Sequence, residues 1–105
     1  MKRFVVSAEA DHDLDEIAEQ IGLNSLSSAA RVIENLYNAM GRLAESPGIG
    51  HWREELADKR HKFFLVHSFL IVYRFELQPI QVIRVLHAAR DVQGILELDS
   101  PVALQ

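Results

Sequence analysis

The hydrophobic period of the sequence changes once, near residue 60, and this change limits the fold more than any other feature. Before that point apolar residues recur at helical spacing, and after it β-branched and aromatic residues form three short runs. Helices followed by strands favour an α+β fold, in which paired helices cover one face of a sheet. The sequence therefore predicts a single domain over residues 1–105 with the order β-α-α-β-β-β and a short final helix.

Two amphipathic helices are predicted in the first half of the chain. The first spans residues 8–21, with Ser7 as its N-cap and Gly22 at its end. The second is capped by one of the serines at positions 25, 27 and 28, and it ends before Pro47 because proline disfavours a helical residue in front of it. About five residues connect the helices, which predicts an antiparallel hairpin. The apolar face predicted for the second helix consists of Val32, Ile33, Leu36, Tyr37, Met40, Leu43 and Ala44.

Four strands are predicted to form the sheet. A short strand over residues 3–6 opens the chain, and strands over residues 62–66, 69–75 and 80–86 form an antiparallel meander. The last run is apolar on both faces, as in an interior strand, so we expect the opening strand to flank it. The sheet is then four-stranded and mostly antiparallel. Residues 47–50 are expected to form a loop, residues 54–57 allow a helical turn, and Asp91 would cap a final helix containing Val92, Ile95 and Leu96.

Composition narrows the class of protein. Hydrophobic residues make up 49% of the chain and charged residues 25%, which is typical of a soluble globular domain. The chain has no cysteine, so disulfides and thiolate metal sites are excluded. No apolar run approaches the roughly 20 residues of a membrane span, and the N-terminus turns acidic too early for a signal peptide. We therefore expect a cytoplasmic protein with no membrane segment.

Charge is distributed unevenly along the chain. The formal net charge is −4, which weighs against a generic nucleic-acid binder. Residues 1–50 hold four Lys or Arg and eight Asp or Glu, whereas residues 51–91 hold seven and five. An acidic first half is thus followed by a mildly basic middle.

Metal and nucleophile patterns are weak. The five histidines are scattered over different predicted elements, without the paired spacing of a zinc site. Asp11, Asp13 and Asp15 resemble the start of a calcium loop, but the required later Gly and Glu are missing. We interpret these aspartates as a solvated face favoured by the helix dipole. The serines occupy caps and turns, and no glycine-rich phosphate loop is present. No metal and no cofactor are expected.

The densest group of polar residues closes the last strand. Arg84, His87, Arg90 and Asp91 lie there, and Arg74 lies on the adjoining strand, about 5 Å away. One interpretation is an anion or RNA-cleaving site, in which arginine stabilises phosphate charge and histidine moves a proton. The other is structural: Asp91 caps the last helix, Arg90 pairs with a carboxylate and His87 fills the strand end.

Five sequence phrases resemble the RelE/ParE superfamily of bacterial toxins, and within it the ParE branch. They occur in order along nearly the whole chain, which makes them more specific together than singly. They are Ala10-x-x-Asp13-Leu14-x-x-Ile17, Leu43-Ala44-x-x-Pro47-x-x-Gly50, Arg53-x-Glu55-Leu56, Ile71-Val72-Tyr73-Arg74 and Val85-Leu86-His87-x-x-Arg90-Asp91.

The resemblance implies the same element order and the toxin role of a type II toxin–antitoxin module of the plasmid-stabilisation type. RelE-like members cleave mRNA on the ribosome, but Ala88 and Ala89 occupy the place of their catalytic Tyr or His, so no catalytic residue is assigned. ParE-like members bind and inhibit DNA gyrase without catalysis. The implied target-binding residues are Arg74, Arg84, His87, Arg90 and Asp91. Ribosome-dependent mRNA cleavage, or a degenerate non-toxic binding module, remain the alternatives.

The resemblance also implies a cognate antitoxin, encoded beside the toxin, that folds onto it to form a hetero-oligomer. The antitoxin supplies the DNA contact, so the toxin is not expected to bind DNA by itself. Candidate antitoxin-binding residues are Leu26, Tyr37, Trp52 and Phe64. Tyr37 and Phe64 have an alternative as core residues. Trp52, in a loop beside glycines, is the aromatic residue expected to be exposed, and tryptophan is a common interface anchor.

Overall fold

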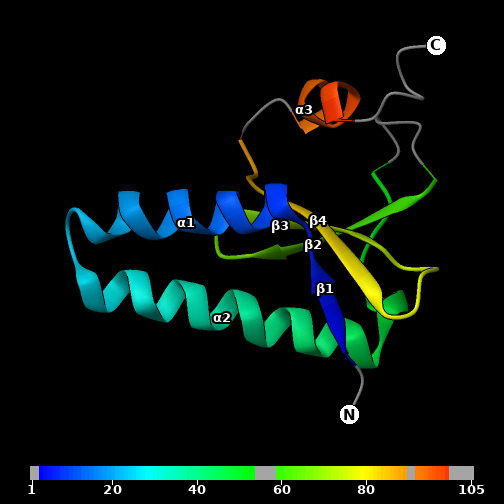
Figure 1. Cartoon of the computed structure of the whole chain (residues 1–105), viewed down its shortest axis with the longest axis horizontal. Coiled ribbons are helices and arrows are strands. Elements are labelled where there is room, and N and C mark those ends of the chain that lie inside the picture. Colours follow the sequence, from blue (N-terminus) through cyan, green and yellow to red (C-terminus); the bar gives the residue numbers. More distant parts are fainter. Residues whose placement is uncertain (1–2, 54–58, 90–91, 100–105) are drawn as a thin grey trace.

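The computed structural model describes residues 3–53, 59–89 and 92–99. Its elements follow the predicted order (Figure 1). They are β1 (Phe4–Val6), α1 (Ala8–Gly22), α2 (Leu26–Glu45), the 3-10 helix η1 (Pro47–Ile49), β2 (His61–Val66), β3 (Phe69–Arg74), β4 (Ile80–His87) and α3 (Val92–Asp99).

The four strands form one sheet in the order β1-β4-β3-β2. β2, β3 and β4 pair in antiparallel fashion, and β1 runs parallel to β4. The prediction of a mostly antiparallel sheet, with the opening strand beside the last one, is therefore confirmed. β4 lies inside the sheet, which explains why its sequence is apolar on both faces.

Local capping sets where the helices begin. The Ser7 hydroxyl accepts a hydrogen bond from the Ala10 N–H at 3.0 Å and donates one to the Ile83 carbonyl at 2.7 Å, so it also ties the start of α1 to β4. Ser25 caps α2 by accepting from the Ser28 N–H at 3.1 Å. Differences from the prediction are small: α1 includes Gly22, and residues 47–49 form a 3-10 turn where a loop was expected. The proposed turn at 54–57 and the Asp91 cap lie outside the described residues.

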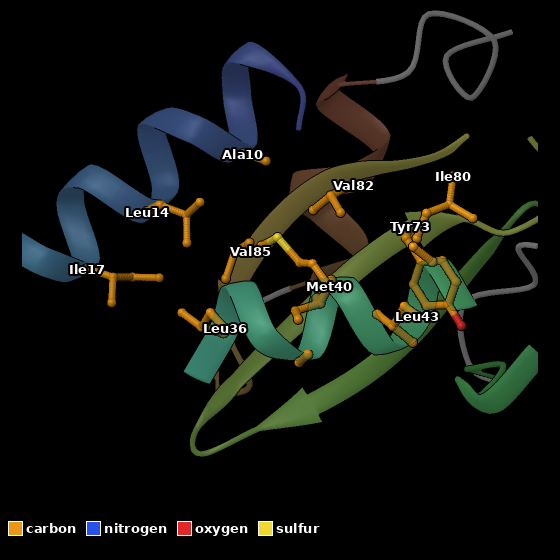
Figure 2. Packing of buried hydrophobic residues seen from close by; sticks show 13 residues of the cluster. Ala10, Leu14, Ile17, Leu36, Met40, Leu43, Tyr73, Ile80, Val82 and Val85 are labelled. Atoms are coloured by element: carbon orange, nitrogen blue, oxygen red, sulfur yellow. The ribbon is translucent and has the colours of Figure 1, made fainter. Parts of the chain in front are cut away.

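α1 and α2 form an antiparallel hairpin whose apolar face covers one face of the sheet. Figure 2 shows these side chains meeting between the layers. The labelled residues are Ala10, Leu14 and Ile17 of α1, Leu36, Met40 and Leu43 of α2, Tyr73 of β3, and Ile80, Val82 and Val85 of β4. Tyr37 does not join this core as the helical pattern predicted. It is 39% exposed because it lies on the flank of α2, where its ring meets Phe4.

The other face of the sheet is covered by α3. Val92 and Leu96 of this short helix pack against Phe63, Leu70, Val72 and Leu86. The sheet is thus buried on both sides, but over unequal areas, since α3 has eight residues and the hairpin helices have fifteen and twenty.

One irregularity in the sheet bears on the functional site. Val72 pairs with Arg84 and Tyr73 pairs with Val82, so Ile83 is an extra residue in β4. Such a bulge breaks the alternation of side chains and redirects the residues beside it. Arg84 pairs with a residue that faces α3, yet its side chain reaches α1 on the other face.

Candidate functional site

Arg84 forms a buried ion pair with Asp13 of α1. Its Nε lies 2.7 Å from Oδ2 of Asp13, and its Nη2 lies 2.8 Å from Oδ1, so both carboxylate oxygens are bound. The Val85 N–H donates a third hydrogen bond to Oδ2 at 3.0 Å. The side chains of Arg84 and Asp13 are only 15% and 8% exposed. This bidentate pair joins α1 to the bulge of β4, and it fixes the arginine in one place.

The interpretation of Asp13 as part of a solvated face is wrong. Asp13 lies three residues after Ala10 and one before Leu14, which places it on the buried face of α1. An aspartate at such a position requires a buried partner. The spacing could therefore have indicated an ion pair, although not which arginine completes it. Asp11 and Asp15 are exposed, in agreement with the prediction for them.

His87 is exposed at the end of β4, and its ring is held in one orientation. The ring packs edge-on against Phe69, its partner on β3, with 5.6 Å between the ring centroids. Its Nδ1 accepts a hydrogen bond from the Ala89 N–H at 3.1 Å. In the neutral ring the proton therefore sits on Nε2, which is left as a donor.

A groove of about 350 Å³ lies between α1 and the ends of β3 and β4. Its lining residues are Asp13, Glu16, Ile17, Gln20, Ile21, Phe69, Val85 and His87. The charged side chains among them are carboxylates, and the Asp13 carboxylate is already neutralised by Arg84. The groove suits apolar and cationic side chains of a protein partner better than it suits phosphate.

Arg74 lies apart from Arg84 and has its own carboxylate partner. It pairs across the sheet with Gln81, three residues before Arg84, and its guanidinium binds Glu76 through Nε and Nη2. Burial by itself raises the pKa of the Glu76 carboxyl. Hydrogen bonds from Arg74 and from the backbone, together with the positive charges of Arg74 and His61, outweigh this effect, so the pKa is lowered overall. The expected cluster of Arg74 with Arg84 is not formed.

The remaining predicted target-binding residues, Arg90 and Asp91, lie outside the described residues. The four candidate antitoxin-binding residues are spread over the molecule and do not line one groove. Leu26 is 80% exposed near the tip of the helical hairpin, and Trp52 is 38% exposed beyond η1. Phe64 is half-buried against the core and meets the Arg42 guanidinium, whereas Tyr37 contacts β1. The prediction that Trp52 is exposed is confirmed.

A family model described as the ParE toxin of the type II toxin–antitoxin system parDE matches residues 4–92. The chain belongs to the ParE toxin family. The match extends from β1 to the first residue of α3 and includes Asp13, Arg84 and His87. The expected family and the expected fold class are both confirmed.

A solved structure described as the chromosomal ParDE TA system from P. aeruginosa has the same fold as this ParE-family chain. The TM-score is 0.68, and the match covers 83% of this chain and 96% of that chain. The two sequences are 18% identical, so the likeness concerns the fold. A search of curated proteins finds no match.

One phrase of the ParE resemblance has a structural explanation that the sequence did not reveal. The hydroxyl of Tyr73 donates to the Pro47 carbonyl at 2.6 Å and accepts from the Gly50 N–H at 3.0 Å. Gly50 is required because a Cβ there would collide with the fully buried Tyr73 ring. Burial raises the pKa of the Tyr73 hydroxyl, although the Gly50 hydrogen bond opposes this. Pro47-x-x-Gly50 thus fixes the end of α2 to β3.

The described residues contain neither a metal cluster nor a membrane-spanning helix. Within them, no three His, Asp or Glu side chains gather closely enough to hold a metal ion. No helix in the described part of the chain has the length and apolar character needed to cross a membrane.

Proposed function

We propose that this chain is the toxin of a type II module that acts in the cytoplasm by binding DNA gyrase, and that a cognate antitoxin neutralises it. Membership of the ParE toxin family supports the module. The mode of action is inferred from the site between α1 and β4, where the acidic groove and the Asp13–Arg84 pair favour contact with a protein.

The observation that carries this proposal is the state of the two arginines that RNA cleavage would need. Phosphate stabilisation requires cations that are free to meet the developing negative charge. Arg84 is held by Asp13 in a buried bidentate pair, and Arg74 is held by Glu76. A phosphate entering beside Arg84 would have to displace a carboxylate that has three hydrogen bonds and is mostly excluded from water.

The hydrogen bonding of His87 also favours protein binding over RNA cleavage. A general base needs a ring nitrogen without a proton facing the substrate. Nδ1 of His87 is engaged by the Ala89 N–H, so the neutral ring presents a proton at Nε2. An exposed, oriented donor beside Phe69 is suited to a hydrogen bond with a protein carbonyl or carboxylate.

Two assays of the purified full-length chain test the proposal. We expect inhibition of gyrase supercoiling of relaxed plasmid, relief of that inhibition by the antitoxin, and intact message in a translating extract. His87→Ala is expected to weaken inhibition, whereas His51→Ala, which changes an exposed histidine outside the groove, serves as its control. Message cleavage that is lost in Arg74→Ala would reject gyrase binding and assign the ribosome as the target.

A further inference from the structure

A cation and two aromatic rings form a compact cluster beyond the end of α2. The Lys62 ammonium lies 4.9 Å from the centroid of the Trp52 ring and 5.2 Å from that of Phe75. The two rings meet edge to face with 5.2 Å between centroids. The ammonium also donates to the Gly48 carbonyl at 3.2 Å. These contacts hold Trp52 in one orientation although it is 38% exposed.

The cluster has hydrogen-bond donors left over. An ammonium group has three N–H donors, and the Gly48 carbonyl takes one of those on Lys62. Across residues 3–53, 59–89 and 92–99, no hydrogen bond is made by the indole N–H of Trp52. A carboxylate accepts hydrogen bonds from both kinds of donor, and aromatic rings offer apolar contact to the carbon chain that carries it.

An apolar cavity of about 330 Å³ is lined by Pro47, which directly precedes Gly48, the residue whose carbonyl binds Lys62. Its apolar lining comes from Ala44, Pro47, Leu77, Pro79 and Ile80, and Arg3 adds a positive charge. The end of α2, η1 and the turn between β3 and β4 lie together at this end of the molecule (Figure 1). The cavity is large enough for one apolar side chain beside the cationic cluster.

Positive charges outnumber negative ones around the cluster, where Glu45 is exposed at the end of α2 and the Glu76 carboxylate is paired with Arg74. Lys59 and Arg60 are exposed just before β2, and Arg3 lies at the cavity. By contrast, α1 carries six of the fifteen acidic residues of the chain. The surface formed by Trp52, Phe75, Lys62 and the adjoining cavity, here named the Trp52 surface, is therefore complementary to an acidic ligand.

We propose that the Trp52 surface binds an extended acidic segment of the antitoxin, which places an apolar side chain in the cavity and a neighbouring carboxylate on Lys62 and the indole N–H. This inference rests on the proposed function, because it assumes a neutralising partner. A peptide fits better than single-stranded RNA, since base stacking needs an open aromatic face, whereas Lys62 occupies one face of the Trp52 ring and Phe75 packs against the same ring edge to face. Pre-oriented tryptophan beside a cation is also typical of a strong interface anchor.

The test is titration calorimetry of the full-length chain with the purified protein encoded by the neighbouring reading frame. Trp52→Ala and Lys62→Met are each expected to weaken binding by at least about tenfold. Lys62→Arg keeps the cation over the rings and should retain binding to within about threefold. Arg31→Met removes one positive charge from an exposed position of α2, at the end of the helix away from the cluster, and is the matched control. Added salt should weaken the wild type more than Lys62→Met.

Failure of the Trp52 surface and failure of the proposed function give different results in these experiments. Wild-type affinity in both Trp52→Ala and Lys62→Met, with loss in Leu26→Ala or Tyr37→Ala, would overturn the Trp52 surface and leave neutralisation intact. No binding of the neighbouring protein to the wild type would overturn both. Binding of a uridine 20-mer that is lost in Trp52→Ala, with antitoxin binding unchanged, would assign the surface to RNA. Each variant is checked by circular dichroism, so that unfolding is not mistaken for lost contact.

Discussion

Removing the carboxylate of Asp13 should cost the fold a large part of its stability. Asp13→Ala leaves the Arg84 guanidinium and the Val85 N–H without their shared acceptor, in a place where the two side chains of the pair are 15% and 8% exposed. Breaking a buried pair in this way costs roughly 3–5 kcal/mol. The arginine can turn partly toward water, so we expect the lower end, about 3 kcal/mol. For a domain of this size that corresponds to a fall in melting temperature of roughly 12–24 °C.

A double-mutant cycle isolates the pair itself. Urea unfolding at pH 7, followed by circular dichroism, is measured for Asp13→Ala, Arg84→Ala and the double variant. The coupling energy is expected to be about 2 kcal/mol, because each single variant leaves a buried partner unmatched. The same cycle on His12 and Glu16, an exposed pair on the same helix, should give less than about 0.5 kcal/mol. Equal coupling in the two cycles would refute a buried, structural Asp13–Arg84 pair.

Two further changes test the connection between the end of α2 and β3. Gly50→Ala should destabilise the chain by roughly 2–4 kcal/mol in urea unfolding, because its Cβ meets the buried Tyr73 ring, whereas Gly48→Ala meets no atom within 4 Å and should cost less than about 1 kcal/mol. Tyr73→Phe should cost roughly 1–3 kcal/mol by loss of two hydrogen bonds. Because burial raises the Tyr73 pKa in the folded chain, the unfolded chain releases this proton first, and wild-type stability should decline as pH rises past about 10. Tyr73→Phe should show less of that decline, and an identical alkaline profile for both proteins would assign it to another group.

The order and type of the elements were predictable because they depend on local patterns. The helical spacing around Leu14 and Leu36 and the β-branched run after Ile80 each lie within one element. Ser7 and Pro47 also act on their immediate neighbours. Exposure of Tyr37 was not predictable from its spacing, since it lies at the edge of the apolar face, where the position of β1 decides what is covered.

The site was less predictable because its contacts join distant parts of the chain. Asp13 and Arg84 are 71 residues apart, and the bulge at Ile83 that brings them together has no local sequence signal. The hydroxyl of Tyr73 likewise meets backbone groups 23 and 26 residues away. Arginines near the last strand therefore indicated an anion site in the sequence. In the structure their charges are neutralised by carboxylates from elsewhere: Asp13 of α1 binds Arg84, and Glu76, which follows β3, binds Arg74.

The two proposed surfaces lie at opposite ends of β4, and this separation constrains how neutralisation can work. Ile80 lines the cavity of the Trp52 surface and His87 lines the acidic groove, so the two are separated by roughly 23 Å at about 3.3 Å per residue. Their charge preferences are opposite. If gyrase occupies the groove, an antitoxin segment confined to the Trp52 surface would bind without blocking it, and a ternary complex would form. Neutralisation then requires an antitoxin long enough to cover both ends, whose acidic part meets Lys62 and whose other part reaches the groove beside Glu16.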